Sequence, residues 1–337
     1  MKTLAFFNNK GGVGKTTLAY HLAWMLSDLG RKVLVLDLDP QANLTSMFLT
    51  EDRLEQIWDP SVPTGLSIMG ALEPLVRGLG DIRDPHVEQI SQRLHLIPGD
   101  LGLAGFESEL SEAWGKCLDR LEPAFRKTSA FHRIAELAAQ KVGAEVVVMD
   151  VGPNFGAINR SALITATHVI VPLAPDLFSI QGLRNLGPTL RKWREEWSDR
   201  KSRNPAHDLS LPAGQIEPIG YVILQFGIRD SRPVKAYERW LAKIPDTYHR
   251  CVLDAPEPGL LFARDQSCLG LVKHYRSLVP LAMEMRKPIF HLKAADGAIG
   301  AHYDAVQKCG EAFAELAGKI SDRLELQPAA NELLLIP

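Results

Sequence analysis

The feature that most constrains this sequence is a glycine loop near its start. Residues 8–23 read NNKGGVGKTTLAYHLA and follow the apolar run TLAFFN at 3–8. A buried strand, a glycine loop and a helix in this order surround an anion with backbone amides and the positive end of a helix dipole. Gly14-Lys15-Thr16 supplies the ending of a nucleotide site, with Lys15 for the β- and γ-phosphates and the Thr16 hydroxyl for Mg²⁺. The alternative is a glycine-rich turn that contains Gly-Lys-Thr by chance.

A second lysine separates this loop from the common pattern. The strict form GxxxxGK[ST] needs glycine at position 9, where the chain has Asn9, and Lys10 follows before Gly11 and Gly12. We expect Lys15 to hold the phosphates of its own subunit. We expect Lys10, at the mouth of the loop, to reach the phosphates of a second subunit docked face to face. Such a cation would neutralise charge in phosphoryl transfer, as an arginine finger does. The alternative for Lys10 is a solvated surface lysine.

The apolar pattern predicts the fold class. Short runs rich in β-branched residues are apolar on successive positions, which is typical of strands buried on both faces of a parallel sheet. They lie at 3–8, 32–37, 145–150, 168–173 and 219–225. Helical patterns lie between them, one with Leu18, Leu22, Ala23 and Leu26 on one face before Gly30, and another at 132–141. This alternation predicts an α/β fold, a doubly wound and mostly parallel sheet flanked by helices, as in P-loop NTPases.

Composition excludes several classes. The formal net charge of the 337 residues is −2, so any binding of nucleic acid must come from a local basic patch. The four cysteines are scattered without metal spacing and fit a reduced cytosolic protein. The first residues read as a strand, not a signal peptide, and no stretch has the length and apolarity of a membrane span. We therefore expect a cytoplasmic protein.

Several motifs together resemble the ParA/MinD family, the SIMIBI-class P-loop ATPases with a deviant Walker A loop, and are closest to ParA-like partition ATPases. KGGVGKTT at 10–17 matches the loop with its signature lysine. Further similar segments are DLDPQAN (37–43), HLIPGDLGLAGFESEL (95–110), EVVVMDVGP (145–153) and HVIVPLAPDLFSIQGL (168–183). The resemblance covers residues 1 to about 190 strongly, and 219–226 and 280–320 weakly.

The resemblance implies a set of cofactors and roles. It implies ATP and Mg²⁺, a homodimer formed on ATP binding, and slow hydrolysis stimulated by a ParB-like or other activating protein. The nucleotide-binding residues would be Lys10, Gly11, Gly12, Val13, Gly14, Lys15, Thr16 and Thr17. A dinucleotide oxidoreductase is excluded, because the loop is not GxGxxG.

Three aspartates follow apolar strands, at the sheet edge where such folds bind ligands. Matching the family motif, Asp39 would orient the attacking water, and Asp37 would be a ligand of Mg²⁺-bound water or a switch residue. Asp150, at the Walker B position, would hold the Mg²⁺ shell with Thr16. The alternative for Asp37 and Asp39 is a helix N-cap. Where the family has DxPP, this chain has Asp150-Val-Gly-Pro-Asn154, and we expect the Gly152 amide to be able to reach the γ-phosphate.

The chain shows no clean linker, which predicts one ATPase domain over 1–325 and a C-terminal tail at 326–337. Two segments look like elaborations of the core, at about 107–130 and 200–218, and the second is predicted to be a surface loop because it is rich in proline.

The purpose of the switch stays open at this point. Nonspecific DNA could bind two basic clusters, one of Arg191, Lys192, Arg194, Arg200, Lys201 and Arg203, and the other of Arg229, Arg232, Lys235 and Arg239. The chain would then be a nucleoid-associated ATPase that partitions or positions DNA or another cargo. The alternative for the first cluster is a solvated helix face, since Glu195, Glu196 and Asp199 interleave. The alternative function is a dimeric switch for a protein partner. A MinD-like membrane role is less favoured, because the tail lacks lysine and arginine.

Overall fold

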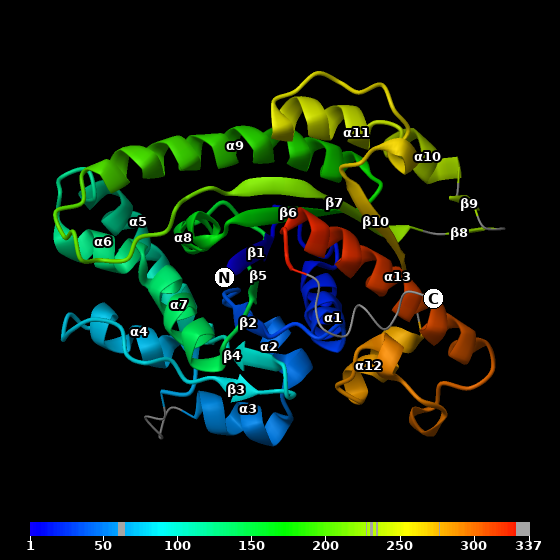
Figure 1. The fold of residues 1–337 in the computed structure, drawn as a ribbon, viewed down its shortest axis with the longest axis horizontal. Coiled ribbons are helices and arrows are strands. Elements are labelled where there is room, and N and C mark those ends of the chain that lie inside the picture. Colours follow the sequence, from blue (N-terminus) through cyan, green and yellow to red (C-terminus); the bar gives the residue numbers. More distant parts are fainter. Residues whose placement is uncertain (60–64, 227, 230–231, 234, 276, 328–337) are drawn as a thin grey trace. The chain divides into compact units, whose positions relative to one another are not determined.

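The computed structural model describes residues 1–59, 65–226, 228–229, 232–233, 235–275 and 277–327 (Figure 1). The chain divides into two compact units. The first comprises Met1–Ala5, Arg31–Val169 and Leu190–Glu217, and the second comprises Phe6–Gly30, Ile170–Thr189 and Pro218–Pro337. Residues 328–337 of the tail predicted at 326–337, and the side chains of Arg229, Arg232 and Lys235, lie outside what is described.

The strands form a mostly parallel sheet of eight, in the order β10-β7-β6-β1-β5-β2-β4-β3, and a short pair of β8 with β9. Their bounds are β1 (Lys2–Phe6), β2 (Val33–Asp37), β3 (Glu88–Gln89), β4 (Leu94–Ile97), β5 (Val146–Asp150), β6 (His168–Leu173), β7 (Glu217–Phe226), β8 (Ile228–Arg229), β9 (Arg232–Pro233) and β10 (Cys268–Lys273). At one edge of the large sheet, β3 runs antiparallel to its neighbour β4. All five predicted strands are present, and the predicted doubly wound α/β class is confirmed.

Helices occupy most of the remaining described chain. They are α1 (Lys15–Asp28), α2 (Asn43–Phe48), α3 (Glu51–Trp58), α4 (Ile68–Val76), α5 (Phe106–Lys116), α6 (Glu122–Thr128), α7 (Ala130–Val142), α8 (Ala157–Thr165), α9 (Leu177–Ser202), α10 (Lys235–Leu241), α11 (Ile244–Thr247), α12 (Leu278–Glu284) and α13 (Ala301–Arg323). Single turns of 3₁₀-helix lie at Leu101–Gly105, Phe262–Arg264, Ile289–His291 and Ala294–Asp296, and Tyr248–Leu253 is π-helical. No helix in the described part of the chain combines the length and apolarity needed to cross a membrane.

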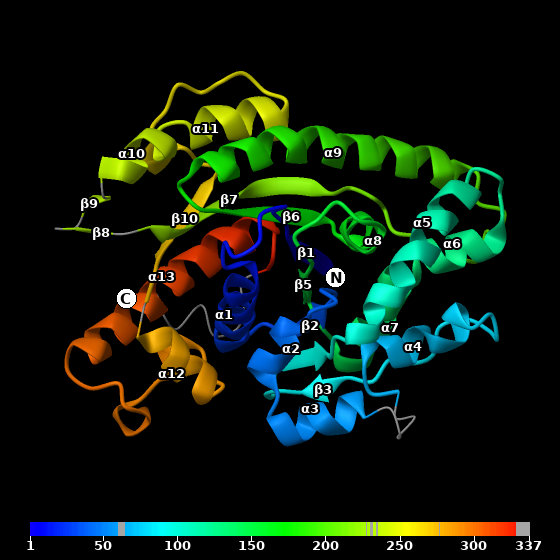
Figure 2. The same cartoon turned by 180° about the vertical axis from the view of Figure 1, so that it is seen from behind.

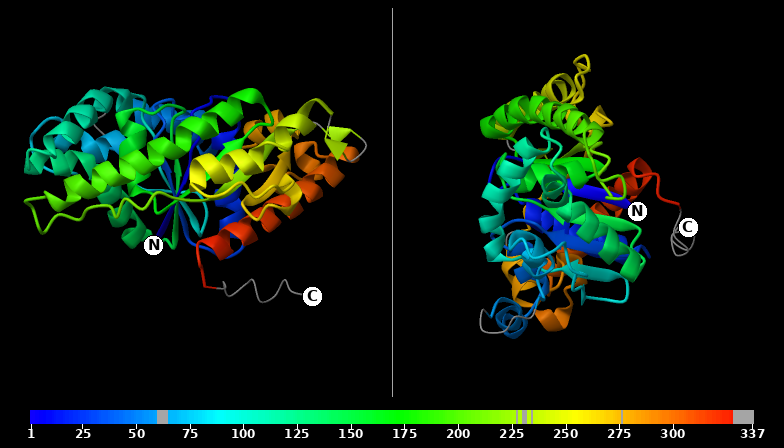
Figure 3. Two further views of the ribbon diagram at one scale, coloured as in Figure 1. Left: turned by 90° about the horizontal axis from the view of Figure 1, so that it is seen from above. Right: turned by 90° about the vertical axis from the view of Figure 1, so that its left-hand side faces the viewer.

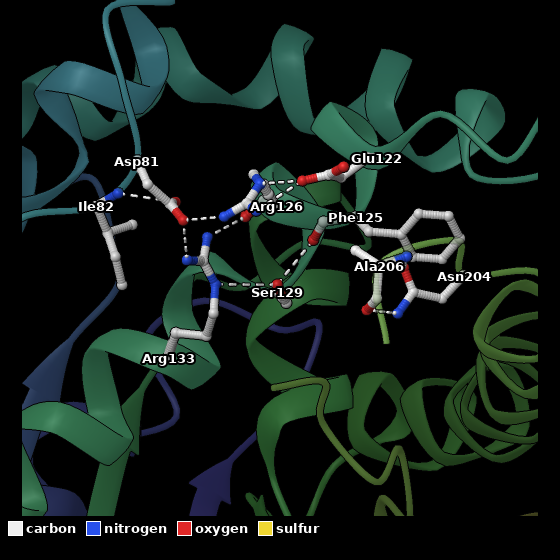
Figure 4. A network of polar contacts seen from close by, with 9 residues as sticks. All are labelled: Asp81, Ile82, Glu122, Phe125, Arg126, Ser129, Arg133, Asn204 and Ala206. Carbon is white, nitrogen blue, oxygen red and sulfur yellow. Dashed lines mark hydrogen bonds and ion pairs between the residues drawn. The ribbon is translucent and has the colours of Figure 1, made fainter. Parts of the chain in front are cut away.

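In the first unit, the segment 107–130 forms α5 and α6. Leu110, Trp114 and Phe125 of these helices are buried. A polar network joins the segment to its surroundings, because the Asp81 carboxylate accepts from the guanidiniums of both Arg126 and Arg133 (Figure 4). The segment therefore packs into the core of this unit.

The stretch predicted to be a loop, 200–218, has no helix or strand between residues 203 and 216. It runs back along the end of α9 (Figure 3, left). The buried indole of Trp197 donates to the Pro212 carbonyl at 2.9 Å. Gly214 has φ +72° and lies so close that a Cβ there would be 2.2 Å from Trp197 Cδ1. The loop is thus anchored on one aromatic side chain.

In the second unit, α1 packs against α13 (Figure 2). The buried imidazole of His21 joins them, because its ring stacks on Phe313 with centroids 5.0 Å apart. His21 Nε2 accepts from the Ile289 amide at 3.1 Å, so Nδ1 carries the proton and donates to the Thr17 carbonyl at 2.8 Å. Burial lowers the pKa of His21 to about 4, which keeps the ring neutral. The helix that follows the glycine loop is thereby fixed to the C-terminal part of the chain.

Candidate nucleotide site

The glycine loop lies in the second unit, between β1 and α1. Gly12 has φ +72° and Gly14 has φ +93°, which are left-handed values that favour glycine. Gly14 is also the N-cap of α1, and no side chain caps that helix start among the described residues. Lys15, the first helical residue, is only 7% exposed. The first-turn amides of α1, with no side-chain cap, and a buried Lys15 beside them are the features that an anion site requires.

Lys10 has a charged partner in a later part of the chain. Its ammonium forms an ion pair with Asp176, and lies 5.7 Å from the centre of the Phe178 ring. Asn8 fixes the backbone nearby, because its Oδ1 accepts from the Lys10 amide at 3.0 Å and its Nδ2 donates to the Pro172 carbonyl at 2.6 Å. The sequence alternative of a freely solvated lysine does not describe this side chain.

Asp176 lies three residues beyond the end of β6, and sequence reasoning gave it no role. Burial alone would raise its pKa, but hydrogen bonds from Lys10 and from the Ser179 amide, at 2.8 Å, hold the pKa of Asp176 below its ordinary value. The available signal was the position of an aspartate at the carboxyl end of a buried strand.

A cavity of about 140 Å³ adjoins the glycine loop within the second unit. Gly14 and Thr17 are part of the lining, together with Leu224 of β7, Val272 of β10 and Tyr275, which follows β10. The lining is mainly apolar, so this cavity suits a flat, weakly polar ring better than a charged group.

In the first unit, β2 and β5 bring two aspartates together. The register pairs Asp37 with Asp150 at the ends of the two strands, and both are fully buried. Burial, followed by the charge of Asp150, raises the pKa of Asp37 from 3.8 to about 7. The two carboxylates therefore lie at the same end of neighbouring parallel strands.

Asp37 is strongly tied to protein donors. Its Oδ2 accepts from the Thr45 amide at 2.8 Å and the Thr45 hydroxyl at 2.7 Å, and its Oδ1 accepts from the Asp39 amide at 3.3 Å. Thr45 Oγ1 in turn accepts from the Gly99 amide at 2.8 Å. Because Thr45 lies in the first turn of α2, the Asp37 carboxylate accepts from a backbone amide that has no partner within the helix, although Asp37 is not the N-cap residue itself. The capping alternative raised from the sequence therefore describes much of its role.

Asp39 occupies a different position. It is 7% exposed, and its Oδ1 accepts from the Gln41 amide at 3.0 Å. Ala42, with φ +50°, is the N-cap of α2, so Asp39 is not the capping residue. Asp39 shapes the turn between β2 and α2.

The loop after β5 corrects one expectation. The Gly152 amide donates to Asn159 Oδ1 at 3.0 Å, and Asn159 Nδ2 donates back to the Gly152 carbonyl at 2.9 Å. An amide engaged in this way would have to leave Asn159 before it could reach a phosphate. Asn154 shares the network, since its carbonyl accepts from Asn159 Nδ2 at 2.8 Å. The departure from DxPP is thus accompanied by two asparagines that fix the loop.

Glu107 holds the end of the same loop, although sequence reasoning gave it no role. Its carboxylate accepts from the Ala157 amide at 2.5 Å and the Ile158 amide at 2.8 Å, at the start of α8. Gly156 permits this approach, since a Cβ there would lie 2.6 Å from Glu107 Oε1. A carboxylate at this helix end is stabilised by the helix dipole. No local pattern connects residues so far apart in sequence.

These residues differ in their fit to a metal ion. No group of three or more histidine, cysteine, aspartate or glutamate side chains arranged for a metal occurs in the described chain. Asp150 offers carboxylate oxygens at the end of β5, as Mg²⁺ prefers. Asp37 fits direct ligation less well, because its oxygens already accept from Thr45 and Asp39. The donor set therefore suits an ion that takes most of its ligands from water and phosphate.

The first basic cluster does not form a uniform basic surface. Arg200 is buried, donates to the Trp114 carbonyl at 2.7 Å, and stacks over the Trp114 ring at 4.4 Å. Arg203 pairs with Asp199 at 3.0 Å, and Lys192 lies 3.9 Å from Glu196. The sequence alternative of a helix face with salt-bridge partners is the better description.

The mostly parallel sheet and the glycine loop before α1 are those of a P-loop nucleotide-binding protein. The model of the AAA-domain family matches residues 1–202, more than half of the chain. The chain therefore belongs to that family, as a ParA-like P-loop ATPase of the SIMIBI class.

Named relatives agree with this assignment. The chain is 30% identical over 194 residues to the cell division protein PomZ of Myxococcus xanthus, covering 57% of this chain and 52% of PomZ. It is 28% identical over 205 residues to the chromosome partitioning protein ParA of Caulobacter vibrioides, covering 59% and 66%. The chain thus spans less than two thirds of the length of each. A variant of Cyanothece McdA, solved as a complex with ATP, shares the fold with a TM-score of 0.64, 16% identity and 97% of each chain covered.

Proposed function

We propose that this protein binds ATP with Mg²⁺, forms a homodimer around two nucleotides, and hydrolyses ATP to drive the partitioning or positioning of DNA or another cargo. The observation that carries the proposal is the separation of the two lysines in one loop. Lys15 lies at the uncapped start of α1, whereas Lys10 is held at Asp176. One cation thus serves the chain's own nucleotide and the other remains for a second copy.

The roles of the remaining residues follow from their positions. Residues 10–17 would surround the phosphates, and Thr16 and Asp150 would hold Mg²⁺. Asp37, whose carboxylate accepts from Thr45, would be a ligand of Mg²⁺-bound water or a switch residue. Mg²⁺, when bound, neutralises phosphate charge. Asp39 orients the attacking water. Because the sequence shows no clean linker, we propose that residues 1–325 form one ATPase domain.

The apolar cavity beside Gly14 and Thr17 supports adenine as the base. A purine ring needs a flat apolar slot near the α-phosphate, and this cavity begins at the first turn of α1. The McdA structure was solved with ATP, which supports the same choice of nucleotide.

The test of the proposal is Lys10→Ala, with Lys308→Ala, an exposed residue of α13, as the matched control. We expect Lys10→Ala to bind a fluorescent ATP analogue within about threefold of wild type, because Lys15 and the loop amides remain. We expect Lys10→Ala to lose either ATP-dependent dimerisation, measured by light scattering, or ATP hydrolysis, because no cation would reach the partner's phosphates. Normal ATPase activity in Lys10→Ala would refute the trans role of this lysine.

DNA binding is the cargo proposal with a specific surface feature behind it. In α10 and two residues beyond its end, Arg239 lies 4.4 Å and Lys243 lies 5.5 Å from the ring centre of Trp240. A basic and aromatic group of this kind suits contact with a nucleic-acid backbone. A nucleoid-associated place in the cytoplasm would follow from it.

The second candidate is a switch for a protein partner, such as a ParB-like activator. The observation that favours it is the engagement of the first basic cluster, in which Arg200 and Arg203 have partners in the chain. Binding to random duplex DNA with ATP, with ADP and without nucleotide, at two salt concentrations, separates the two candidates. Salt-sensitive binding that occurs only with ATP supports the DNA-binding candidate. A dimer with ATP and no DNA binding supports the protein switch.

A further inference from the structure

A carboxylate beside Lys10 competes with the phosphates of a second copy for the lysine ammonium. The ammonium is paired with the Asp176 carboxylate and lies over the Phe178 ring, 5.7 Å from its centre. All of these residues belong to the second unit, so the arrangement exists within one copy of the chain. A lysine that is to place its charge on a second copy is thus already bound to a carboxylate of its own chain.

Asp176 is fixed independently of Lys10. Its Oδ1 accepts from the Ser179 amide at 2.8 Å, and Ser179 Oγ accepts from the Ala174 amide at 3.1 Å. Ser179 is fully buried. The turn that leads from β6 into α9 therefore holds the carboxylate in place, and the long lysine side chain is the partner that can move.

We propose that Asp176 is a latch for Lys10, which keeps the lysine in its own chain until a second copy with bound nucleotide takes it over. The inference rests on the proposed trans role of Lys10 and adds the residue that restrains it. Asp176 acts through Lys10 and is a positioning residue. The latch sets the protein concentration at which two nucleotide-bound copies dimerise.

The exposure of the pair suits a latch that opens. The side chains of Lys10 and Asp176 are 28% and 33% exposed, so water screens their attraction and the pair is weak. The phosphates of a nucleotide carry more negative charge than one carboxylate and can displace it. Phe178 is 69% exposed and lies beside the lysine, where a docked copy would cover it.

The variant Asp176→Asn removes the negative charge and keeps an acceptor for the Ser179 amide at the start of α9. Asparagine has nearly the same shape and still offers Oδ1 to the Ser179 amide, and it is a good residue at a helix start. Asp304→Asn makes the same change of charge at an exposed position of α13 and is the matched control. Thermal unfolding of both variants establishes that the fold is kept.

The decisive measurement is the dimer dissociation constant by sedimentation, in ATP and Mg²⁺. We expect Asp176→Asn to dimerise about tenfold more tightly than wild type, because each copy contributes about threefold and the factors multiply. Asp304→Asn should match wild type, and Lys10→Ala/Asp176→Asn should match Lys10→Ala, since the latch has no effect without the lysine.

A second measurement tests the ion pair between Lys10 and Asp176 in the nucleotide-free chain, where no dimer is needed. Acetic anhydride labels lysines of the nucleotide-free chain, and mass spectrometry compares Lys10 with Lys308 as an internal reference. Acetic anhydride acylates the neutral amine nitrogen, and the Asp176 carboxylate lies against Lys10 Nζ and restricts access to it. Asp176→Asn should therefore raise Lys10 labelling severalfold and leave Lys308 unchanged.

The outcomes separate the latch from the proposed function. If wild type dimerises with ATP, and Asp176→Asn dimerises equally or more weakly, the latch is wrong while the proposed function stands. If Lys10 labelling does not change in Asp176→Asn, the latch is likewise overturned. If wild type forms no dimer with ATP, the proposed dimer fails, and the latch as its threshold fails with it.

Discussion

The glycine loop and the C-terminal end of α9 both place several basic residues close together in sequence, yet the structure uses them in opposite ways. In the loop, left-handed glycines separate Lys10 from Lys15, and each lysine has its own surroundings. In α9, the helix sends Arg200 inward against Trp114 and leaves Lys201 exposed.

The comparison shows that a cluster of charges in sequence has no fixed meaning by itself. In a loop, glycine conformations decide where a side chain points, and the motif specifies them residue by residue. In a helix, the 3.6-residue period separates neighbours, so part of a cluster faces the core. Arg200 shares its buried face with Trp193 and Trp197.

The variant Arg200→Ala is the strongest test of whether this arginine of α9 has a structural role. It removes the hydrogen bonds to the Trp114 carbonyl at 2.7 Å and the Glu196 carbonyl at 2.9 Å, as well as the stacking on Trp114. We expect the free energy of unfolding to fall by about 2–4 kcal/mol in urea titrations.

The neighbouring variant Lys201→Ala is the control for Arg200→Ala. Lys201 is exposed, so its change should stay within about 0.5 kcal/mol. If Arg200→Ala unfolds like wild type and instead loses DNA binding, Arg200 is a DNA contact, and the distinction between loop and helix fails.

The sequence predicted the sheet and the loop because both depend on local pattern. Apolar runs marked five strands, and the glycine motif marked the start of α1. It missed β4, because the four residues Leu94–Ile97 are followed at once by a proline turn that dominates the pattern. It also missed β10, in which only Leu269 and Val272 are buried, so that no continuous apolar run marks the strand.

Other site residues could not be predicted because their partners are distant in the chain. Asp176 meets Lys10 across 166 positions, and Glu107 meets the start of α8 across 50. The fate of Arg200 likewise depends on Trp114, 86 positions away. Only the folded sheet brings such pairs together, so spacing within a motif carries no signal of them.

A buried carboxylate extends the comparison to acidic residues. Burial and the charge of Asp150 raise the pKa of Asp37 to about 7. The native state then binds more protons than the unfolded chain between about pH 4 and pH 7, so this residue's contribution to stability falls as pH rises through that range. Without Mg²⁺, we expect Asp37→Asn to be more stable than wild type at pH 8 by about 1–2 kcal/mol, and nearly equal at pH 4.

The measurement for Asp37→Asn is urea unfolding at both pH values, and the difference from wild type removes the contributions of other groups. Asparagine keeps an acceptor for the amide and hydroxyl of Thr45, so the loop geometry is retained. Equal destabilisation at pH 4 and pH 8 would mean that Asp37 works as a charged anchor of α2 instead.

The smallest expected effect belongs to Arg203, at the exposed end of α9. Its guanidinium lies 3.0 Å from Asp199 one helical turn earlier, and the two side chains are 41% and 50% exposed. An exposed pair of this spacing contributes little, so Arg203→Ala should change the free energy of unfolding by no more than about 0.5 kcal/mol. We also expect no change in ATP-dependent DNA affinity or in its salt dependence, because Asp199 already neutralises the charge. A salt slope that falls by about one unit in this variant would show that Arg203 contacts a phosphate. In that case the end of α9 would form a DNA-binding surface together with the basic and aromatic group around Trp240. The basic residues of α9 would then have a binding role, as those of the glycine loop do.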